Sequence, residues 1–270
     1  MQTLPATHPD DFPVLDTDGL RDRFLVDGLF ATGEVGWAYA HDDRLLLGGV
    51  DLTGEPLTLE APPELAAEHL CDRRELAVVC LDGSVSVETD GQTHELDAFD
   101  VLYVSRGTGS VRLTGTARVY LVAAPAHADH PTAVGRRDEV FGADLGEQEQ
   151  ANVRTVRRYV HADGIASANL VLGITTLAPG SVWNTMPCHT HPRRTEVYLY
   201  TGLGDGRVVH LAGPPTQTRS VVVADGQAVV SPGWSVHTGV GTRAYSFVWA
   251  MAGENQDYAD MDVVDLGSLR

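Results

Sequence analysis

The stretch TEVYLYTGLGDGRVVHLAGPPTQTRSVVVADGQAVVS, residues 195–231, has the pattern that decides the fold. Four short apolar segments, Thr195–Thr201, Gly206–Leu211, Thr218–Val223 and Gln227–Ser231, are separated by turn residues, chiefly Gly, Pro and Asp. Valine and tyrosine favour strands, whereas Gly, Pro and Asp favour the turns between them. Strands at such short intervals predict a β-sandwich or β-barrel.

The same pattern extends outward over most of the chain. Further strands are expected at Leu76–Leu81, Ser84–Glu88, Val101–Ser105, Ala117–Ala123, Ala168–Leu177 and Tyr245–Met251. Helical periodicity is plausible only at Pro63–Leu70 and near Thr17–Phe24. The sequence therefore predicts an all-β fold with few short helices.

Two segments suggest that the chain consists of two degenerate copies of one unit. RRE followed by LAVVCLDG (residues 73–83) resembles RRTE followed by VYLYTGLGDG (residues 193–206). The polar, Gly-containing stretch 125–150 is a suitable linker. We therefore expect an N-terminal half, residues 1–135, and a C-terminal half, residues 136–270, each forming one β-barrel.

The composition excludes several partners. A net charge of −18 disfavours nucleic acid, whose phosphates would be repelled. No apolar run has the roughly 18 residues of a membrane span, and no secretory signal is visible at the N-terminus, so we expect a cytoplasmic protein. The three cysteines, Cys71, Cys80 and Cys188, form no CxxC pair and no disulfide framework.

All 19 basic residues are arginine, and the chain contains no lysine. A Schiff base to a carbonyl substrate requires a lysine amine, as does a Walker A phosphate loop. No GxGxxG dinucleotide fingerprint is present either. Carbonyl chemistry in this protein must therefore depend on a metal or on acid–base side chains, with arginine available for anionic groups.

The segment MPCHTHPRRTE carries the strongest chemical signal. Residues i and i+2 of a strand face the same side, so His189 and His191 can share a metal. A turn at Pro192 would let Glu196 begin the next strand and point back toward them. His237 follows 41 residues after Glu196, a separation that suits a ligand on a later strand of the same barrel. These four residues are the predicted ligands of one divalent metal; zinc, manganese, iron, nickel and cobalt all suit such a set.

The spacing His-x-His-x4-Glu, followed by Gly226-x5-Pro232-x-Trp234-x2-His237, resembles the two motifs of the cupin superfamily. Cupins usually have Gly where this chain has Trp234. Longer strings, PGSVWNTMPCHTHPRRTEVYLY, SPGWSVHTGVGT and FVWAMAGENQDYADMDVV, resemble the 5-keto-4-deoxyuronate isomerase family, and the similarity is dense over residues 151–264.

This resemblance implies two cupin barrels, zinc bound by His189, His191, Glu196 and His237, a homohexamer, and a role in the catabolism of pectin-type uronates. The implied reaction is an aldose-to-ketose shift that converts 5-dehydro-4-deoxy-D-glucuronate to 3-deoxy-D-glycero-2,5-hexodiulosonate. One departure is Arg158, where the family carries Lys; an arginine keeps the charge but cannot act as a base near neutral pH.

Residues near these motifs supply the remaining candidates. The acid–base candidates are Asp257, Tyr258 and His161. Candidates for binding the substrate carboxylate are Arg154, Arg158, Arg193 and Arg194.

Three alternative functions remain open from the sequence. Another cupin isomerase, acting on 5-deoxyglucuronate or a related sugar acid, would use the same ligands, as would an iron-dependent cupin dioxygenase. Oxygen uptake by the iron-loaded protein would distinguish the dioxygenase, because an isomerase consumes none. The third alternative, a sugar-binding cupin without turnover, would have no need of four intact metal ligands.

Overall fold

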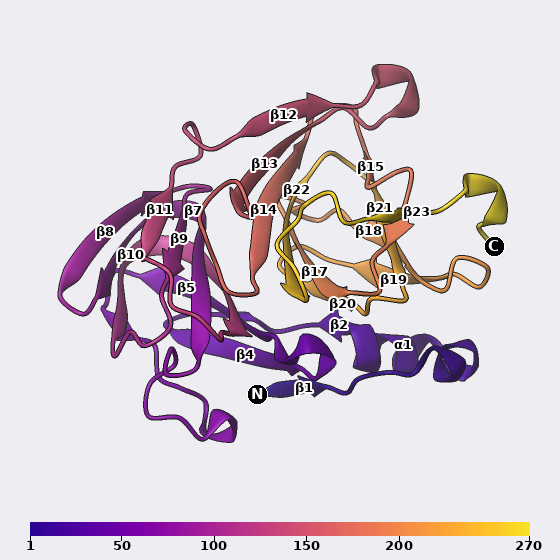
Figure 1. Ribbon diagram of the computed structural model, residues 1–270. Coiled ribbons are helices and arrows are strands. Elements are labelled where there is room, and N and C mark those ends of the chain that lie inside the picture. Colours follow the sequence, from indigo (N-terminus) through magenta and orange to yellow (C-terminus); the bar gives the residue numbers. More distant parts are fainter.

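The computed structural model describes all 270 residues, and nearly all of its regular structure is β (Figure 1). The strands are β1 (Gln2–Leu4), β2 (Leu25–Val26), β3 (Phe30–Ala31), β4 (Glu34–Ala40), β5 (Leu46–Thr53), β6 (Leu57–Thr58), β7 (Arg74–Thr89), β8 (Gln92–Asp97), β9 (Val101–Val104), β10 (Val111–Pro125), β11 (Ala133–Gly135), β12 (Gly142–Leu145), β13 (Arg154–Val160), β14 (Val171–Leu177), β15 (Trp183–Asn184), β16 (His189–Thr190), β17 (Arg194–Thr201), β18 (Val208–Gly213), β19 (Arg219–Val223), β20 (Ala228–Ser231), β21 (Val236–Gly241), β22 (Ser246–Gly253) and β23 (Asp262–Val263). The helices are α1 (Thr17–Phe24) and the short 3-10 helices η1 (Pro9–Val14), η2 (Asp42–Arg44), η3 (Pro63–Leu65), η4 (Gln148–Gln150) and η5 (Leu266–Ser268). No helix combines the length and the apolar character that crossing a bilayer requires.

The first half of the chain forms a ten-stranded sheet with the order β1-β4-β5-β10-β7-β9-β11, to which β3, β6 and β8 are attached at the sides. Strand β7 contains the unbroken apolar run LAVVCL, residues 76–81, and both faces of this run are buried. Leu76 and Val78 point into a core of 20 buried residues within this half. Ala77 and Val79, on the opposite face, join the core that the two halves share.

The second half forms a barrel from two sheets. A seven-stranded sheet, β12-β13-β14-β22-β17-β20-β2, faces a four-stranded sheet, β15-β21-β18-β19. Because side chains alternate along a strand, the two faces of β17 lie in two different environments. Tyr198 and Tyr200 point into the barrel among 18 buried residues, while Val197 and Leu199 point outward into the shared core.

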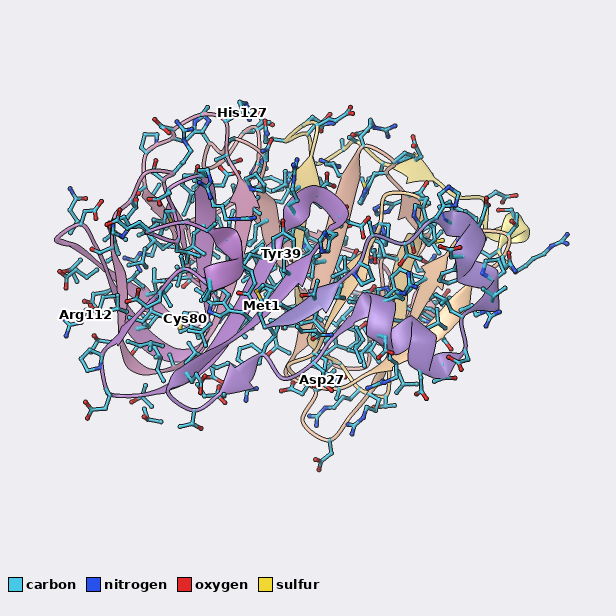
Figure 2. All side chains as sticks on the ribbon, turned by 90° about the horizontal axis from the view of Figure 1, so that it is seen from below. Met1, Asp27, Tyr39, Cys80, Arg112 and His127 are labelled. Carbon is cyan, nitrogen blue, oxygen red and sulfur yellow. The ribbon has the colours of Figure 1, made fainter.

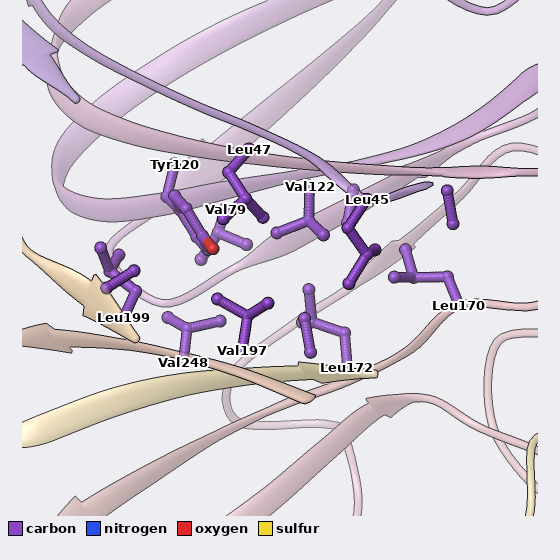
Figure 3. Close-up of a cluster of buried hydrophobic side chains, with 14 of the residues drawn as sticks. Leu45, Leu47, Val79, Tyr120, Val122, Leu170, Leu172, Val197, Leu199 and Val248 are labelled. Carbon is purple, nitrogen blue, oxygen red and sulfur yellow. The ribbon is translucent and has the colours of Figure 1, made fainter. Parts of the chain in front are cut away.

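The shared core holds the two large sheets face to face and contains 27 buried residues. Figure 3 shows Leu47, Val79 and Tyr120 from the first half opposite Val197 and Val248 from the second. Burial of this much apolar surface is the dominant contribution that joins the halves.

The N-terminal segment contacts both halves. Strand β1 pairs in parallel with β4, and β2 pairs with β20 of the second half, where Leu25 lies opposite Val229. Figure 2 shows α1 and these first strands lying across one side of the molecule, with Met1 and Tyr39 near the middle of that side. Phe12 and Phe24 pack edge-on against Trp234 of the barrel. The division of the chain between residues 135 and 136 stays a prediction.

Most predicted elements are present. The differences concern two strands, one helix and the linker. The two strands expected at Leu76–Leu81 and Ser84–Glu88 are one long strand, β7, because a bend with Gly83 at φ +69° continues the pairing with β10. The helix expected at Pro63–Leu70 is only the 3-10 helix η3. It ends at Ala66, whose left-handed backbone (φ +46°) cannot continue a helix.

The stretch expected to be a linker, Pro125–Gln150, contains β11 and β12. The predicted helix near Thr17–Phe24 is confirmed as α1, which Asp16 caps through the N–H of Gly19.

The strand order supports the predicted repeat. β7 lies between β10 and β9, as β17 lies between β22 and β20. When Arg73-Arg74 is aligned in sequence with Arg193-Arg194, Leu76 aligns with Glu196. Leu76 pairs with Val104 on β9, and Glu196 pairs with Ser231 on β20. An apolar side chain thus stands in the first half where the second half has a carboxylate.

Candidate metal centre

The structure brings the four predicted ligands together inside the second barrel. Donor atoms of His189, His191, Glu196 and His237 all lie within 4.8 Å of one another. His191, Glu196 and His237 are buried, and His189 is partly exposed toward a cavity. A cluster of three imidazoles and one carboxylate is a suitable donor set for a divalent transition metal.

Local structure explains the convergence. His189 begins β16, which β23 supports through the pair His189 and Val263. The chain then turns at Pro192, and the turn closes with a 2.9 Å hydrogen bond from the N–H of Arg194 to the carbonyl of His191. This turn returns Glu196 to the same side as the imidazoles, as the sequence predicted.

The remaining ligand comes from the facing sheet. His237 lies on β21 opposite Ala212 of β18, and Glu196 lies opposite Ser231 of β20. The centre therefore spans both sheets of the barrel, which is the arrangement expected for a ligand on a later strand.

The nitrogen and oxygen atoms point at one another. Glu196 Oε2 lies 2.9 Å from His191 Nε2 and 2.8 Å from His237 Nε2. His237 Nε2 also lies 3.0 Å from Nε2 of His189. The four donor atoms are therefore close enough together to coordinate one cation.

Backbone carbonyls fix the orientation of two rings. Nδ1 of His191 lies 2.9 Å from the carbonyl oxygen of Arg194, and Nδ1 of His237 lies 3.4 Å from that of Ser235. A ring that donates its Nδ1–H outward presents the Nε2 lone pair inward, which is the usual arrangement of metal-binding histidines.

The electrostatics favour a neutral imidazole at His189 beside an ionised carboxylate. Burial, followed by the neighbouring His237, lowers the pKa of His189 to about 3. Burial alone would raise the pKa of Glu196, but His237 and His191 hold it well below its usual range. Burial likewise opposes protonation of His191, yet its hydrogen bond to Glu196 raises the pKa of this ring. A buried carboxylate among imidazoles is a centre that a cation would neutralise.

The centre opens into a cavity of about 340 Å³. Phe247, Trp249 and Met251 form an apolar wall. Arg154 is the only cationic side chain in the lining outside the histidines, and its Nη1 donates to the carbonyl of Asn152 at 2.8 Å. Burial lowers the pKa of Arg154 from its usual value; an arginine in such a site still keeps its charge near neutral pH.

Of the other predicted residues, Tyr258 reaches this cavity, and Arg158 packs against its ring. The ring of Tyr258 packs 5.3 Å from that of Trp249. The guanidinium of Arg158 lies 4.8 Å above the ring of Tyr258 and 4.1 Å above that of Phe141. Burial raises the pKa of Tyr258, so its hydroxyl stays protonated near neutral pH.

Asp257 and His161 do not line the cavity. The Asp257 carboxylate accepts the N–H of Ala259 at 2.9 Å. Nδ1 of His161 accepts the N–H of Asp163 at 3.3 Å.

Arg193 and Arg194 hold the segment that follows β22. Arg193 Nε donates to both carboxylate oxygens of Asp260, at 2.7 and 2.9 Å. The buried Arg194 donates to the carbonyls of Asp257 and Asp260, at 2.6 and 2.8 Å. Both side chains thus fix the loop that carries Tyr258, and both line a second cavity, of about 630 Å³, that contains none of the four metal-binding candidates.

Sequence reasoning missed three polar residues of the cavity wall: Tyr198, Thr185 and Thr175, which lies on β14. Tyr198 had a signal, because it lies two positions after Glu196 on one strand and so faces the same side. Thr185 had none, since it lies in the irregular segment between β15 and β16.

Comparison with known proteins agrees with this architecture. The chain is 51% identical to the 4-deoxy-L-threo-5-hexosulose-uronate ketol-isomerase of Kineococcus radiotolerans, and 42% identical to that of Lachnoclostridium phytofermentans. Each alignment covers 100% of both chains.

Solved structures share the fold at low sequence identity. An IolB-like protein from Salmonella typhimurium LT2 superposes with a TM-score of 0.72 at 16% identity, covering 90% of this chain and 97% of the other. Oxalate decarboxylase from Lactobacillus farciminis gives a TM-score of 0.59 at 12% identity, covering 81% and 79%. The predicted two-cupin fold is confirmed.

The sequence pattern of the KduI/IolB family matches residues 29–266, which include all four candidate ligands and every strand except β1 and β2. With full-length relatives at 42–51% identity, this match establishes that the chain belongs to the KduI/IolB family.

Proposed function

We propose that this protein is a 4-deoxy-L-threo-5-hexosulose-uronate ketol-isomerase, which converts 5-dehydro-4-deoxy-D-glucuronate to 3-deoxy-D-glycero-2,5-hexodiulosonate in uronate catabolism. The observation that carries the proposal is the cluster of His189, His191, Glu196 and His237 at one end of a cavity that also holds Arg154. Full-length similarity to proteins with that name supports the choice of substrate.

We further propose that the four residues hold one zinc ion per chain. The fit rests on the convergence of Nε2 of His191 and His237 on Oε2 of Glu196, with both Nδ1 atoms facing carbonyls. A zinc ion bound there would polarise the neighbouring carbonyl and hydroxyl oxygens of the substrate. Elemental analysis of the purified protein tests the identity of the metal.

The other residues of the cavity have distinct roles in this proposal. Arg154 binds the substrate carboxylate, because it is the cation within the cavity, and Arg158 keeps Tyr258 in place by stacking on its ring. Tyr258 donates its hydroxyl hydrogen to a substrate oxygen. Phe247, Trp249 and Met251 exclude water from the enediol, which forms when the hydroxyl-bearing carbon loses a proton and the carbonyl oxygen gains one, and which collapses to the ketose when a proton returns to the former carbonyl carbon.

The native assembly is proposed to be a homohexamer. This proposal rests on the resemblance of the chain to the 5-keto-4-deoxyuronate isomerase family. Light scattering coupled to gel filtration tests this, with a mass of six chains expected; a monomeric mass would contradict it.

The function is tested by incubating the protein with the unsaturated uronate released by pectate or hyaluronate breakdown and following the product by NMR. His189→Ala and His237→Ala are expected to abolish conversion, because each removes one of four metal ligands. His94→Ala is the matched control, since this histidine lies in the first half and bonds only to Thr89. Full activity in the two ligand variants would contradict the metal-centred mechanism.

A further inference from the structure

Two hydroxyl groups on the cavity wall have no role in the function proposed above. Oγ1 of Thr185 and the phenolic oxygen of Tyr198 lie 2.8 Å apart, and neither makes another hydrogen bond. Both residues line the same cavity as His189, His191 and Glu196. One hydrogen bond within the pair uses one of its two hydroxyl hydrogens, so the other hydrogen is available to a third partner in the cavity.

The ring of Tyr198 is held in place. It packs edge-on against His237, with ring centroids 5.4 Å apart, and lies 4.7 Å from the ring of Phe247. Only 3% of this residue is exposed. Its hydroxyl is therefore fixed beside the metal-binding cluster rather than free to move into solvent.

Thr185 has an unusual backbone. Its φ is +48°, in the left-handed region that a β-branched residue rarely adopts. Such strain persists only where the surroundings impose it, and it is concentrated at functional sites. In this conformation the hydroxyl of Thr185 lies within hydrogen-bond distance of the hydroxyl of Tyr198.

Buried hydrogen bonds of the preceding residue, Asn184, hold the backbone of Thr185 in this conformation. The side-chain N–H₂ of Asn184 donates to the hydroxyls of Tyr245 at 2.7 Å and Tyr200 at 3.4 Å. The backbone carbonyl of Asn184 accepts the hydroxyl of Thr238 at 2.7 Å. Asn184 is thus fixed at the end of β15, and Thr185 follows directly from it.

We infer that the Thr185–Tyr198 hydroxyl pair is a hydrogen-bond donor to the substrate oxygen on which negative charge develops during isomerisation. The inference rests on the proposed ketol-isomerase function and assigns a further residue pair to that site. Preorganised donors of this kind act mainly in the transition state, so they affect kcat more than KM. The pair donates a hydrogen bond and transfers no proton to the substrate.

The test compares Tyr198→Phe and Thr185→Val with the wild-type protein. Each change removes one hydroxyl and retains the shape of the side chain. We expect kcat to fall by about 10- to 100-fold, with KM changed by less than about threefold. The double variant is expected to lose no more than about twofold beyond the Tyr198→Phe variant, because the hydroxyls act as a unit. Thr185→Ser, which keeps the hydroxyl, is expected to retain most of the activity.

Two further readouts separate this role from a structural one. Metal content per chain and melting temperature are measured for every variant, and both are expected to stay close to wild type. Tyr120→Phe is the matched control, since it removes a buried and unpartnered hydroxyl from the core between the halves. Its kcat is expected to be unchanged.

The outcomes distinguish the two proposals. If the wild-type protein converts the uronate and Tyr198→Phe keeps kcat within about twofold of wild type, the role of the hydroxyl pair is overturned and the proposed function stands. Loss of metal in Tyr198→Phe, in parallel with loss of activity, would also overturn it, because the tyrosine would then only support His237. A wild-type protein without activity on the uronate would overturn the proposed function and the role of the pair with it.

Discussion

At the scale of single residues, Arg154 is the side chain on which recognition of the substrate carboxylate depends. We expect Arg154→Gln to lower kcat/KM by about 10- to 100-fold, mainly through KM, since a charge-assisted hydrogen bond contributes about 1.5–3 kcal/mol. Arg157→Gln is the control, because Arg157 lies on the same strand but donates to the carbonyl of Arg137 outside the cavity. Steady-state kinetics on the uronate measure both. Equal effects of the two changes would contradict the assignment.

Glu75 is a buried carboxylate that joins the halves. It accepts the backbone N–H groups of Ala168, Asn169 and Leu170 and the hydroxyl of Tyr103, all at 2.7 Å. Glu75→Gln replaces one acceptor oxygen with a donor that faces other donors. We expect a loss of about 2–4 kcal/mol in the free energy of unfolding, measured by denaturant titration.

Glu88→Gln is the control for Glu75, since Glu88 lies on the same strand and is exposed. Its effect is expected to stay within about 0.5 kcal/mol. A loss at Glu75 no larger than at Glu88 would show that the buried carboxylate does not hold the halves together.

Three residues of the metal centre could be predicted because their geometry is local, whereas His237 comes from the facing sheet and was predicted from its spacing in the sequence. Strand alternation relates His189 to His191, and one turn returns Glu196 to the same side. The cavity wall could not be predicted as well, because its members come from distant strands and an irregular loop. Arg193 and Arg194 are adjacent to the motif in sequence, yet they bind the loop after β22, whereas Arg154 reaches the cavity from β13.

At the scale of elements, the loop after β22 depends on an ion pair. Arg193, followed by the hydrogen bond from Asn255, lowers the pKa of Asp260 to about 2. The unfolded value is about 3.9, so the carboxylate stabilises the folded state fully above pH 4 and loses this effect as the pH falls toward 2. We expect the difference in melting temperature between wild type and Asp260→Asn to be constant from pH 7 to 5 and to shrink below pH 4. A difference that does not change with pH would contradict this.

Element boundaries were predicted best where turn residues flank a strand, as at β17 and β20, whose predicted limits agree with the structure to within one residue. They were predicted less well at β7, because LAVVCL carries no alternation that marks where the strand continues through its bend. Short strands such as β2 and β16 have only two residues, and their pairing depends on partners far away in the sequence.

At the scale of the whole molecule, the halves share one core. Arg118 reinforces the contact by bonding to Asp51 in the first half at 2.9 Å and to Asp225 in the second at 3.1 Å. The sequence indicated two similar halves, but it could not show that the outward face of β17 is buried against the other sheet. That burial depends on Val197 and Leu199, which look like ordinary residues of a barrel strand.

The shared core predicts that the second half does not fold alone. A fragment of residues 136–270 keeps all four metal-binding candidates but lacks β2, the aromatic residues Phe12 and Phe24, and the sheet that covers Val197 and Leu199. Exposure of so large an apolar surface favours collapse or aggregation. We expect this fragment to bind a hydrophobic dye and to melt without a cooperative transition by circular dichroism, whereas the full chain melts cooperatively. A fragment with a sharp transition and a dispersed amide NMR spectrum would show instead that the metal-binding barrel is an independent domain, and that the division between residues 135 and 136 is a true domain boundary.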